Sequence, residues 1–412
     1  RLSNLLDDEP GEIAVVVADI DGFGVINDSF GHDAGDHVLR HVADRLRSIE
    51  PSPHTVARLA GDEFVLLFRG IDHPSSAQAA GESTRAALDA PLSGLAGSVR
   101  VTVGLCAGVT IAGHRTEAPE ALRNAQTALH RAKSSGPGNV RLFDQAMRDA
   151  AAGRLGLEQE LREAIEQQHL SLDYQIGVDA QTGVMVGAEA LVRWEHPSGR
   201  RMPDEFISLA EETGLIVPLG RAVMRTAVRQ AAAWRGSGDL PDRFRVSINV
   251  SARQVDDPDR LLYDLVQDLG VHPSAAGGIA IELTETVVAE NPRVPYLLDE
   301  CRALGVAVLL DDFGTGYSSF AALRNYPVDY IKIDRSFVNH VANGGRDTAM
   351  VRAMIEMANA LGIGVIAEGV ETIAQRDALV TLGCDVIQGH LIHRPSSPPA
   401  VTALLRGGHV LD

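Results

Sequence analysis

Eight short apolar segments in the second half of the 412-residue chain limit its possible folds more than any other feature. They cover residues 170–176, 184–192, 245–250, 279–284, 306–311, 329–333, 363–367 and 385–391. Stretches with a helical pattern lie between most of them, at 219–235, 258–269, 292–304, 345–361 and 371–382. Eight strands alternating with helices over about 250 residues predict an α/β barrel of the TIM type. Only a short turn joins the first two segments, so we expect those two strands to be antiparallel.

Polar residues occur within these segments or directly after them, where barrel enzymes collect their functional side chains. Asp311 and Asp312 follow five apolar residues and precede a glycine-rich turn. Six of the other segments contribute one polar residue each, namely Glu189, Asn249, Glu282, Lys332, Glu368 and Gln388. Any one of them could be a satisfied polar group of the core or a solvated turn residue. Several carboxylates brought together would repel one another without a cation, so we expect a site for Mg²⁺ or Mn²⁺.

The amino-acid composition limits the kinds of binding partner and the cellular compartment that we expect for this protein. The net charge is −18, the opposite of the balance usual in duplex-binding proteins, so we expect no nucleic-acid partner. The three cysteines, Cys106, Cys301 and Cys384, are too far apart to suggest a disulfide framework or a zinc site, and we expect a cytoplasmic protein. No apolar run approaches about 18 residues, so we expect no membrane span in this sequence. The chain begins with Arg1 rather than Met, which suggests a piece of a longer protein with a possible upstream anchor.

The composition and pattern divide the chain into a first domain at 1–145, a helical linker at 146–160 and a second domain at 161–412. The first domain has an α+β pattern, with strands expected at 13–18, 55–59, 64–68 and 99–105 and helices at 38–49, 75–90 and 117–134. The stretch from Asn27 to Asp36 is rich in turn residues. Gly153 and Gly156 interrupt the linker, and we expect a hinge there.

Two strings of the first domain, R-L-A-G-D-E-F and D-I-D-G-F-G-V-I-N-D-S-F-G-H-D-A-G-D, resemble the GGDEF family of bacterial diguanylate cyclases. The resemblance implies a palm-like fold that joins two GTP molecules across a homodimer. It implies that Asp19, Asp62 and the carbonyl of Ile20 hold Mg²⁺ with GTP. Glu63 would help to deprotonate the attacking 3′-hydroxyl, which suits phosphoryl transfer by positioning and charge neutralisation.

The same resemblance implies that Asn27 and Asp36 read guanine and that Lys133 reaches a phosphate. The sequence departs from the family pattern at three positions, of which Gly24 and Pro137 weaken the comparison with an active cyclase, whereas the family sometimes tolerates the exchange at Ala60. Ala60 replaces the first glycine of the signature, and Gly24 and Pro137 stand where a phosphate-binding Lys and an Arg are usual. The inhibitory product site is also missing, because residues 51–54 read P-S-P-H. The domain is therefore either a working cyclase or a GTP-binding domain without turnover.

In the second domain, E-A-L-V-R-W at 189–194 resembles the signature of EAL-domain cyclic di-GMP phosphodiesterases. The strings S-I-N-V-S, I-E-L-T-E-T, L-D-D-F-G-T-G-Y-S-S, I-K-I-D, A-E-G-V-E and Q-G-H-L-I-H-R-P follow in the order of that family. The resemblance implies two Mg²⁺ or Mn²⁺ ions, a hydroxide that attacks phosphorus, and linear pGpG as the product.

The first ion would be held by Glu189, Asn249, Glu282 and Asp311. The second would be held by Asp311, Asp312 and Glu368. The resemblance further implies that Lys332 orients the attacking water and that Glu368 is a candidate general base.

The remaining implied roles concern the substrate and the supporting side chains. Arg193 would contact a substrate phosphate, and Gln175 and Gln388 would shape the pocket. Glu285 would anchor the loop at 312–319, and Glu371 would lie behind the metal ligands. Members of this family commonly form homodimers through the barrel.

Three functions remain open on the sequence. The first is a phosphodiesterase with a cyclase-like domain, and the second is an enzyme that both makes and degrades cyclic di-GMP. The third is a non-catalytic receptor that binds cyclic di-GMP or GTP and signals by conformation. Receptors of this kind usually lack metal ligands, whereas here the implied ligand set is complete.

Overall fold

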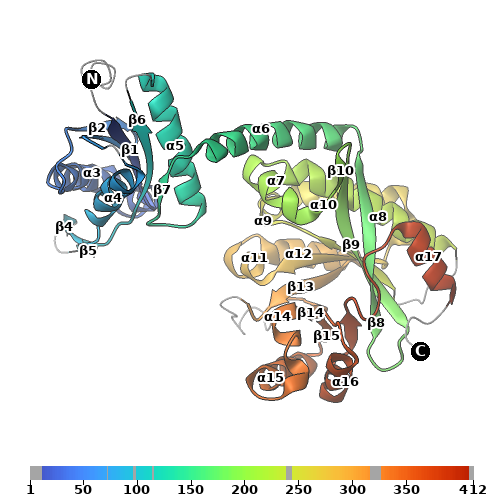
Figure 1. The fold of residues 1–412 in the computed structure, drawn as a ribbon. Helices are drawn as coiled ribbons and strands as arrows, with labels where there is room; N and C mark the ends of the chain where they lie inside the picture. The colour runs from blue at the N-terminus through green and yellow to red at the C-terminus, as the bar shows by residue number, and fades with distance from the viewer. Residues whose placement is uncertain are drawn as a thin grey trace. The chain divides into compact units, whose positions relative to one another are not determined.

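The computed structural model describes residues 12–71, 73–95, 99–113, 116–237, 244–315 and 326–407. The chain forms two compact units, Arg1–Gly156 and Leu157–Asp412 (Figure 1). Each unit has a hydrophobic core of its own. Among the described residues, no helix has both the length and the apolar character needed to cross a membrane.

The first unit is built on a five-stranded sheet in the order β2-β3-β1-β6-β7. The strands are β1 (Ile13–Ile20), β2 (Thr55–Ala60), β3 (Glu63–Arg69), β6 (Leu105–Ala112) and β7 (Val140–Leu142). All eight residues of β1 are buried, because both faces of the sheet are covered. Ala14, Val16 and Ala18 pack in one core, and Val15 and Val17 pack in the other. This period of two is that of a strand between two layers.

Helices cover the two faces of this sheet. Residues of α2 (Phe23–Phe30), α3 (His32–Arg47) and α4 (Pro74–Ala86) belong to the first core, and those of α5 (Ala118–Ser134) to the second. Two short strands, β4 (Leu92–Leu95) and β5 (Val99–Val101), form a separate antiparallel pair. The α+β prediction is confirmed.

Two local expectations for the first unit are wrong. Most of the stretch from Asn27 to Asp36 is helical rather than a turn, and α2 and α3 are separated only by Gly31 with φ 83°. The strand expected at 99–105 is also misplaced, because β5 ends at Val101 and the long buried strand begins at Leu105. Gly108 lies within that strand and lowers the strand propensity of the segment, so the segment carries no clear strand signal in the sequence. A Cβ there would lie 2.1 Å from the Ala125 carbonyl oxygen of α5, so only glycine allows this close packing.

The second unit contains a closed eight-stranded barrel, as the sequence predicted. Its strands are β8 (Leu170–Asp179), β9 (Met185–His196), β11 (Arg245–Asn249), β12 (Ile279–Thr284), β13 (Ala307–Phe313), β14 (Tyr330–Ile333), β15 (Gly364–Ala367) and β16 (Val386–Gln388). Strands β9 and β11 to β16 run parallel, whereas β8 is antiparallel to both of its neighbours, β9 and β16. The predicted antiparallel first pair is therefore confirmed. A short strand β10 (Gly199–Arg201) extends the sheet beside β9.

Helices follow most of the barrel strands. They are α7 (Ile207–Thr213), α8 (Ile216–Gly236), α9 (Ala252–Val255), α10 (Pro258–Val271), α11 (Glu285–Glu290), α12 (Val294–Ala303), α14 (Arg335–Val338), α15 (Arg346–Leu361), α16 (Ile373–Leu382) and α17 (Pro398–Gly407). Short 3₁₀ turns lie at Pro203–Glu205, Pro273–Ala275 and Val341–Asn343.

Helix α6 (Gln145–Glu166) corrects the expectation of a break in the linker. It is continuous through Gly153 and Gly156. A glycine inside a helix costs roughly 0.5–1 kcal/mol relative to alanine, which is too little to end a helix of 22 residues.

Candidate functional site

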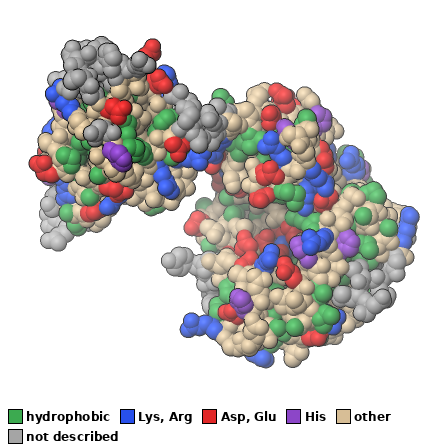
Figure 2. All heavy atoms as spheres, in the orientation of Figure 1, with side chains coloured by type: hydrophobic (Ala, Val, Ile, Leu, Met, Phe, Trp, Pro, Cys, Tyr) green, Lys and Arg blue, Asp and Glu red, His purple; other side chains and the backbone are tan. Residues whose placement is uncertain are grey.

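The carboxyl ends of the parallel strands place four carboxylates around one lysine. Lys332 of β14 is 1% exposed. Its Nζ lies 2.6 Å from Glu282 Oε2 on β12, 3.2 Å from Asp311 Oδ1 on β13 and 3.4 Å from Glu189 Oε2 on β9. Glu368, directly after β15, completes the group at 2.5 Å through Oε1. Figure 2 shows acidic side chains gathered in a hollow of this unit.

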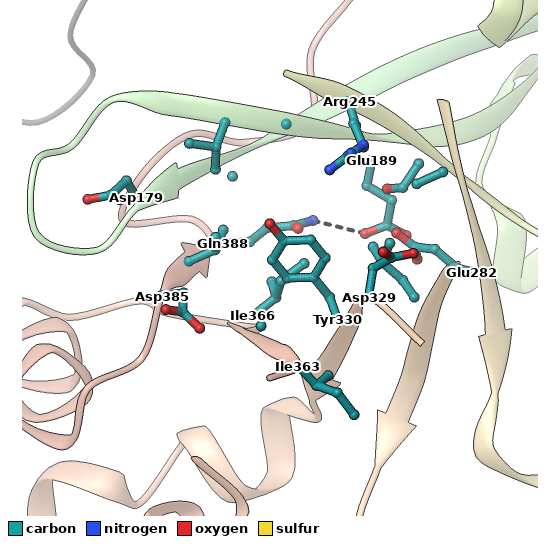
Figure 3. Close-up of a pocket in the computed structure, with 18 of the residues that line it drawn as sticks. Asp179, Glu189, Arg245, Glu282, Asp329, Tyr330, Ile363, Ile366, Asp385 and Gln388 are labelled. Carbon is teal, nitrogen blue, oxygen red and sulfur yellow. Dashed lines mark hydrogen bonds between the residues drawn. The ribbon is translucent and has the colours of Figure 1, made fainter. Parts of the chain in front are cut away.

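Three amide side chains complete the network around Glu189. Asn249 at the end of β11 donates to Glu189 Oε1 over 2.8 Å. Gln388 at the end of β16 donates to Glu189 Oε2 over 2.9 Å (Figure 3). It also donates to Gln175 Oε1 over 3.3 Å. Eight side chains singled out from the sequence therefore lie in one polar network inside the barrel.

Burial and mutual repulsion set the protonation of this network. Burial, together with the charges of Glu189 and Asp311, raises the pKa of Glu282 to about 8, although Lys332 opposes this shift. Burial and the same two carboxylates raise the pKa of Glu368 to about 7. Burial lowers the pKa of Lys332. The surrounding carboxylates together have a larger effect and raise this pKa well above its usual value. The ammonium therefore stays charged at neutral pH.

These residues fit divalent metal ions by their chemistry. Four carboxylates contact one ammonium and Asp312 follows directly after one of them, and carboxylate and amide oxygens are the donors that Mg²⁺ and Mn²⁺ prefer. Glu282 Oε1 is buried and has no hydrogen-bond partner, so one hard donor atom is unsatisfied. No three of the described His, Cys, Asp or Glu residues form a ready metal-binding group. The four carboxylates point instead at the Lys332 ammonium.

Asp312 occupies an unusual place in this arrangement. Its φ is 53°, in the left-handed region that most residues avoid, and the pairing of β13 with β14 shifts register beside it. Successive side chains of a regular strand point to opposite faces, and this turn interrupts that alternation directly after Asp311. The strain therefore lies at the two adjacent carboxylates.

Glu285 supports the turn that follows. Its Oε2 accepts a hydrogen bond from the Gly314 N–H over 3.1 Å. Gly314 has φ 96°, and a Cβ there would lie 2.6 Å from Met354 Cε, so the turn requires glycine. The bond agrees with the anchoring role implied for Glu285, although residues 316–319 of the implied loop lie outside the described residues. Glu371 lies at a more exposed position and forms an ion pair with Arg335 over 3.0 Å.

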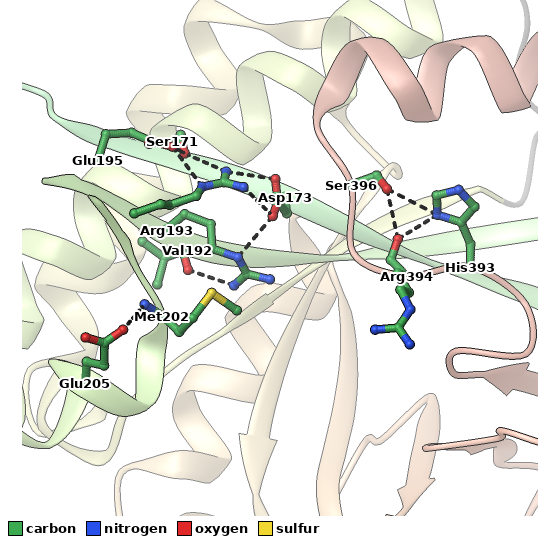
Figure 4. Close-up of polar contacts among 11 residues, drawn as sticks. Ser171, Asp173, Val192, Arg193, Glu195, Met202, Glu205, His393, Arg394 and Ser396 are labelled. Atoms are coloured by element: carbon green, nitrogen blue, oxygen red, sulfur yellow. Dashed lines mark hydrogen bonds and ion pairs between the residues drawn. The ribbon is translucent and has the colours of Figure 1, made fainter. Parts of the chain in front are cut away.

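Arg193 lies apart from the network around Lys332. It faces the same side of β9 as Glu189, four residues further along, or roughly 13 Å at the rise of a strand. It is 3% exposed, and its Nε donates to Asp173 Oδ2 over 3.0 Å (Figure 4). Arg200 of β10 also binds both oxygens of Asp173, over 3.0 and 2.9 Å. Asp173 therefore fixes two guanidinium groups near the predicted phosphate site.

The first unit holds a second polar group at the end of β1. Asp19 is 5% exposed and lies opposite Glu63 of β3 in the sheet register, beside the hairpin turn that contains Asp62. Lys133 of α5 forms an ion pair with Asp19 Oδ1 over 2.7 Å. Burial raises the pKa of Asp19, Lys133 opposes the shift, and the charge of Asp62 adds to it. Without a nucleotide, Lys133 thus contacts a carboxylate rather than a phosphate.

The residues implied to read guanine lie on neighbouring helices. Asn27 of α2 is packed over Gly35 of α3, where a Cβ would lie 2.0 Å from Asn27 Oδ1. That oxygen is buried without a hydrogen-bond partner. Asp36, the next residue of α3, borders a hollow of about 410 Å³ that Leu39, Arg40 and Arg58 also line. Ile20 is the last residue of β1, and its side chain is buried.

Two carboxylates, Asp21 and Asp173, form hydrogen bonds that position parts of the candidate sites, and the sequence alone assigned them no role. Asp21 accepts a hydrogen bond from the Gly138 N–H over 2.8 Å and ties the end of β1 to the turn after α5. Its place two residues after Asp19 was the available signal. Asp173 carried no such signal, because its partners Arg193 and Arg200 lie about 20 and 27 residues away in the sequence.

Comparison with known families matches both units. Residues 1–139 match the family "Diguanylate cyclase, GGDEF domain", and residues 158–395 match the EAL domain family.

Curated relatives share both parts of the chain. A bifunctional diguanylate cyclase/cyclic di-GMP phosphodiesterase, MucR of Pseudomonas aeruginosa, is 37% identical over 386 residues, which are 93% of this chain and 55% of the relative. The cyclic di-GMP phosphodiesterase PdeR of Escherichia coli is 37% identical over 95% of this chain and 58% of its own length. The chain thus spans little more than half the length of these relatives.

Solved structures resemble the barrel. The PaMucR phosphodiesterase in complex with c-di-GMP is 38% identical, with a TM-score of 0.57, and the match covers 60% of this chain and 99% of that one. The EAL domain of Mycobacterium smegmatis DcpA is 34% identical, with a TM-score of 0.51, and the match covers 59% of this chain and all of that one.

Proposed function

The chain belongs to the family of proteins that join a GGDEF domain to an EAL domain, and from that premise we propose that its barrel hydrolyses cyclic di-GMP to linear pGpG. The observation that carries the proposal is the convergence of Glu189, Glu282, Asp311 and Glu368 on Lys332. A non-catalytic receptor has no need for so many buried carboxylates, which repel one another in the absence of cations. The PaMucR phosphodiesterase, whose structure was solved with c-di-GMP, supports the choice of substrate.

The proposed metal sites use the side chains described above. Glu189, Asn249, Glu282 and Asp311 would hold one ion. Asp311, Asp312 and Glu368 would hold the second. When bound, Mg²⁺ or Mn²⁺ would supply Lewis acidity and lower the pKa of an attacking water.

The residues of the chain divide the remaining work. Glu368, directly after β15 and beside Lys332, is placed to take the proton of the attacking water as its oxygen bonds to phosphorus. The bond from phosphorus to one 3′-oxygen breaks, and that oxygen takes up a proton to become a hydroxyl. Lys332 stays charged and orients the water, and Arg193, held by Asp173, contacts a phosphate. Gln175 and Gln388 shape the floor of the pocket.

For the first unit we propose GTP binding with Mg²⁺. Asp19, Asp62 and the Ile20 carbonyl would hold the ion, and Asn27 and Asp36 would read guanine. The hollow beside Asp36 and the unpaired Asn27 Oδ1 support this assignment.

Cyclase activity is a second candidate function of the first unit. The register of Asp19 opposite Glu63 favours it, because the base and a metal ligand are then neighbours. Condensation of two GTP molecules needs two copies of the domain, so this activity also requires a homodimer.

The deciding experiment is chromatographic. The full chain is incubated with cyclic di-GMP and Mg²⁺ or Mn²⁺, and separately with GTP and Mg²⁺, and the products are resolved. We expect pGpG from the first mixture and none from Glu189→Gln. Glu195→Gln, on the exposed end of the same strand, is the matched control and should retain hydrolysis.

The other outcomes separate the alternatives. Binding of cyclic di-GMP without any product would overturn hydrolysis in favour of the receptor. Cyclic di-GMP or pGpG formed from GTP would establish the cyclase, and GTP binding without product would restrict the first unit to a nucleotide-binding role.

A further inference from the structure

The lower half of the barrel contains a cavity that extends from the proposed metal ligands Glu189 and Glu282 to residues with no part in the proposed reaction. It has a volume of about 510 Å³ and opens at the amino ends of the parallel strands, the side opposite the carboxylate-rich mouth (Figure 3). Its outer end is lined by the residues that begin β11, β14, β15 and β16, and its inner end by Glu189, Glu282 and Gln388. TIM-type barrels normally fill this interior with bulky branched side chains.

Several small residues line the cavity, namely Gly177, Gly187, Ala280 and Gly364. The ring of Tyr330 lies over Gly364, where a Cβ would come within 2.4 Å of the ring. Leu309, Ile366 and Tyr330 supply an apolar middle section. The cavity is therefore a shaft with an apolar wall and polar ends.

The charge of the lining is strongly negative. Five carboxylates line the cavity, those of Asp179, Glu189, Glu282, Asp329 and Asp385. The one cation among the described lining residues is Arg245, whose Nε is buried without a partner. Lys332 adds a second positive charge from behind Glu189 and Glu282, so acidic side chains still outnumber basic ones by three.

The carboxylates form two groups, one at each end of the shaft. At the rim, Asp329 Oδ2 accepts from the Val308 N–H and Asp385 Oδ2 accepts from the Val365 N–H, both over 2.8 Å, which leaves the second oxygen of each for a ligand. At the inner end, Glu282 is 1% exposed and its Oε1 has no partner. Asp329, directly before β14, precedes Lys332 by three residues, so the two ends lie on the order of 10 Å apart.

We propose that this shaft binds a linear aliphatic diamine, with one ammonium at the rim aspartates, the other below Glu282, and the methylene chain against Tyr330, Leu309 and Ile366. Ammonium groups supply only donors, which suits ends made of carboxylate acceptors. A metal ion fits less well at the rim, because the described acidic, His and Cys side chains there form no group of three that could hold one. The inner end shares Glu189 and Glu282 with the proposed metal site, whereas the rim aspartates have no role in the proposed hydrolysis.

Calorimetric titration of the metal-free full chain with 1,5-diaminopentane tests the proposal. We expect saturable binding, and about tenfold weaker binding of pentylamine, because one charge-assisted contact is lost. The dicarboxylate glutarate has the same length and opposite charge, and it should not bind.

Variants locate the site without disturbing the fold. Asp329→Asn with Asp385→Asn keeps a carbonyl oxygen for each N–H cap but removes both charges, and it should weaken diamine binding at least about tenfold. Arg245→Met removes the opposing cation and should strengthen binding. Asp299→Asn with Glu356→Gln makes the same charge change at exposed positions and should leave binding unchanged.

Three results would overturn the assignment. They are the absence of saturable diamine binding, equal weakening by the exposed control pair, and binding of glutarate that disappears in Arg245→Met. The last result would show that the shaft takes an anion held by Arg245. Because none of these titrations contains cyclic di-GMP or metal, failure here leaves the proposed hydrolysis untouched.

Discussion

The Nζ atom of Lys332 lies 2.6 Å from Oε2 of Glu282, and neither side chain is more than 1% exposed. The Lys332 ammonium neutralises only part of the negative charge around it. Its contribution to the stability of the fold therefore depends on whether other cations bind at the site. The pair gives the first prediction.

Lys332→Met should destabilise the metal-free protein by about 3–5 kcal/mol, because the removal of one partner leaves buried carboxylates without a cation. Mn²⁺ should raise the melting temperature of this variant more than that of the wild type. Thermal denaturation with and without Mn²⁺ measures both effects. Lys133→Met, which breaks a pair with a 43% exposed lysine, is the control and should cost less. A Lys332→Met protein with the wild-type melting temperature would show that the lysine is not needed for charge balance.

The left-handed backbone at Asp312 predicts that stability and activity change in opposite directions. Asp312→Gly should stabilise the fold by up to about 1 kcal/mol, because glycine adopts this φ without strain, while hydrolysis should fall because a carboxylate is lost. Urea unfolding and product formation test the two parts. Gln168, the other described non-glycine residue with positive φ, at 59°, gives the matched control. Gln168→Gly should stabilise without any loss of hydrolysis, and loss of stability in Asp312→Gly would contradict the strain.

Restoring a cation to the first unit should strengthen its binding of GTP. Gly24 lies on the exposed side of α2, and a Cβ there would have no heavy atom within 4 Å. Gly24→Lys should therefore fold normally and bind a non-hydrolysable GTP analogue with Mg²⁺ about tenfold more tightly. Calorimetry measures the affinity, and Gly24→Gln controls for the gain in helix propensity. Equal affinities of the two variants would show that position 24 does not face the triphosphate.

The buried thiols predict how stability depends on pH in the alkaline range. Burial raises the pKa of Cys301 and of Cys384 from 9.0 to about 12. Below pH 9 the thiols are protonated in both the folded and the unfolded chain, so their contribution is fully present there. Between pH 9 and 12 the unfolded chain releases protons that the folded chain retains, and the free energy of unfolding falls by about 1.4 kcal/mol per pH unit for each thiol.

A double variant isolates this effect from the other groups that titrate at high pH. Cys301→Ala with Cys384→Ala should lose stability less steeply than the wild type between pH 9 and 11. Urea unfolding at several pH values provides the slopes. Identical slopes in the two proteins would mean that the thiols do not cause the dependence.

Much of the barrel could be predicted because its signals are local. Each strand is a short apolar run, and Glu189, Glu282 and Asp311 lie on those runs in positions that face the same interior. The closure of the barrel then brings them together without further information.

The remaining features depend on contacts between distant residues. The position of β6 rests on the fit of Gly108 against α5, and a single sequence does not reveal the helix that will pack there. Asp173 binds Arg193 because the register of β8 and β9 brings the two side chains together, and no sequence motif indicates this register. The small residues of the lower barrel look like weak strand positions in the sequence, and only the closed barrel shows that they line a cavity.

The antiparallel strand β8 has a consequence for the order in which the protein can fold. Among the barrel strands, β8 is synthesised first, and one of its two neighbours, β16, is synthesised last. The hydrogen bond between Gln175 and Gln388 joins residues 213 positions apart in the sequence. Until β16 arrives, β8 exposes an unpaired edge, and Glu189 lacks the hydrogen bond from Gln388. Such a long-range closure is intrinsically slow, and the hydrogen bonds of the acidic centre are complete only once the segment that contains residue 388 has joined the barrel.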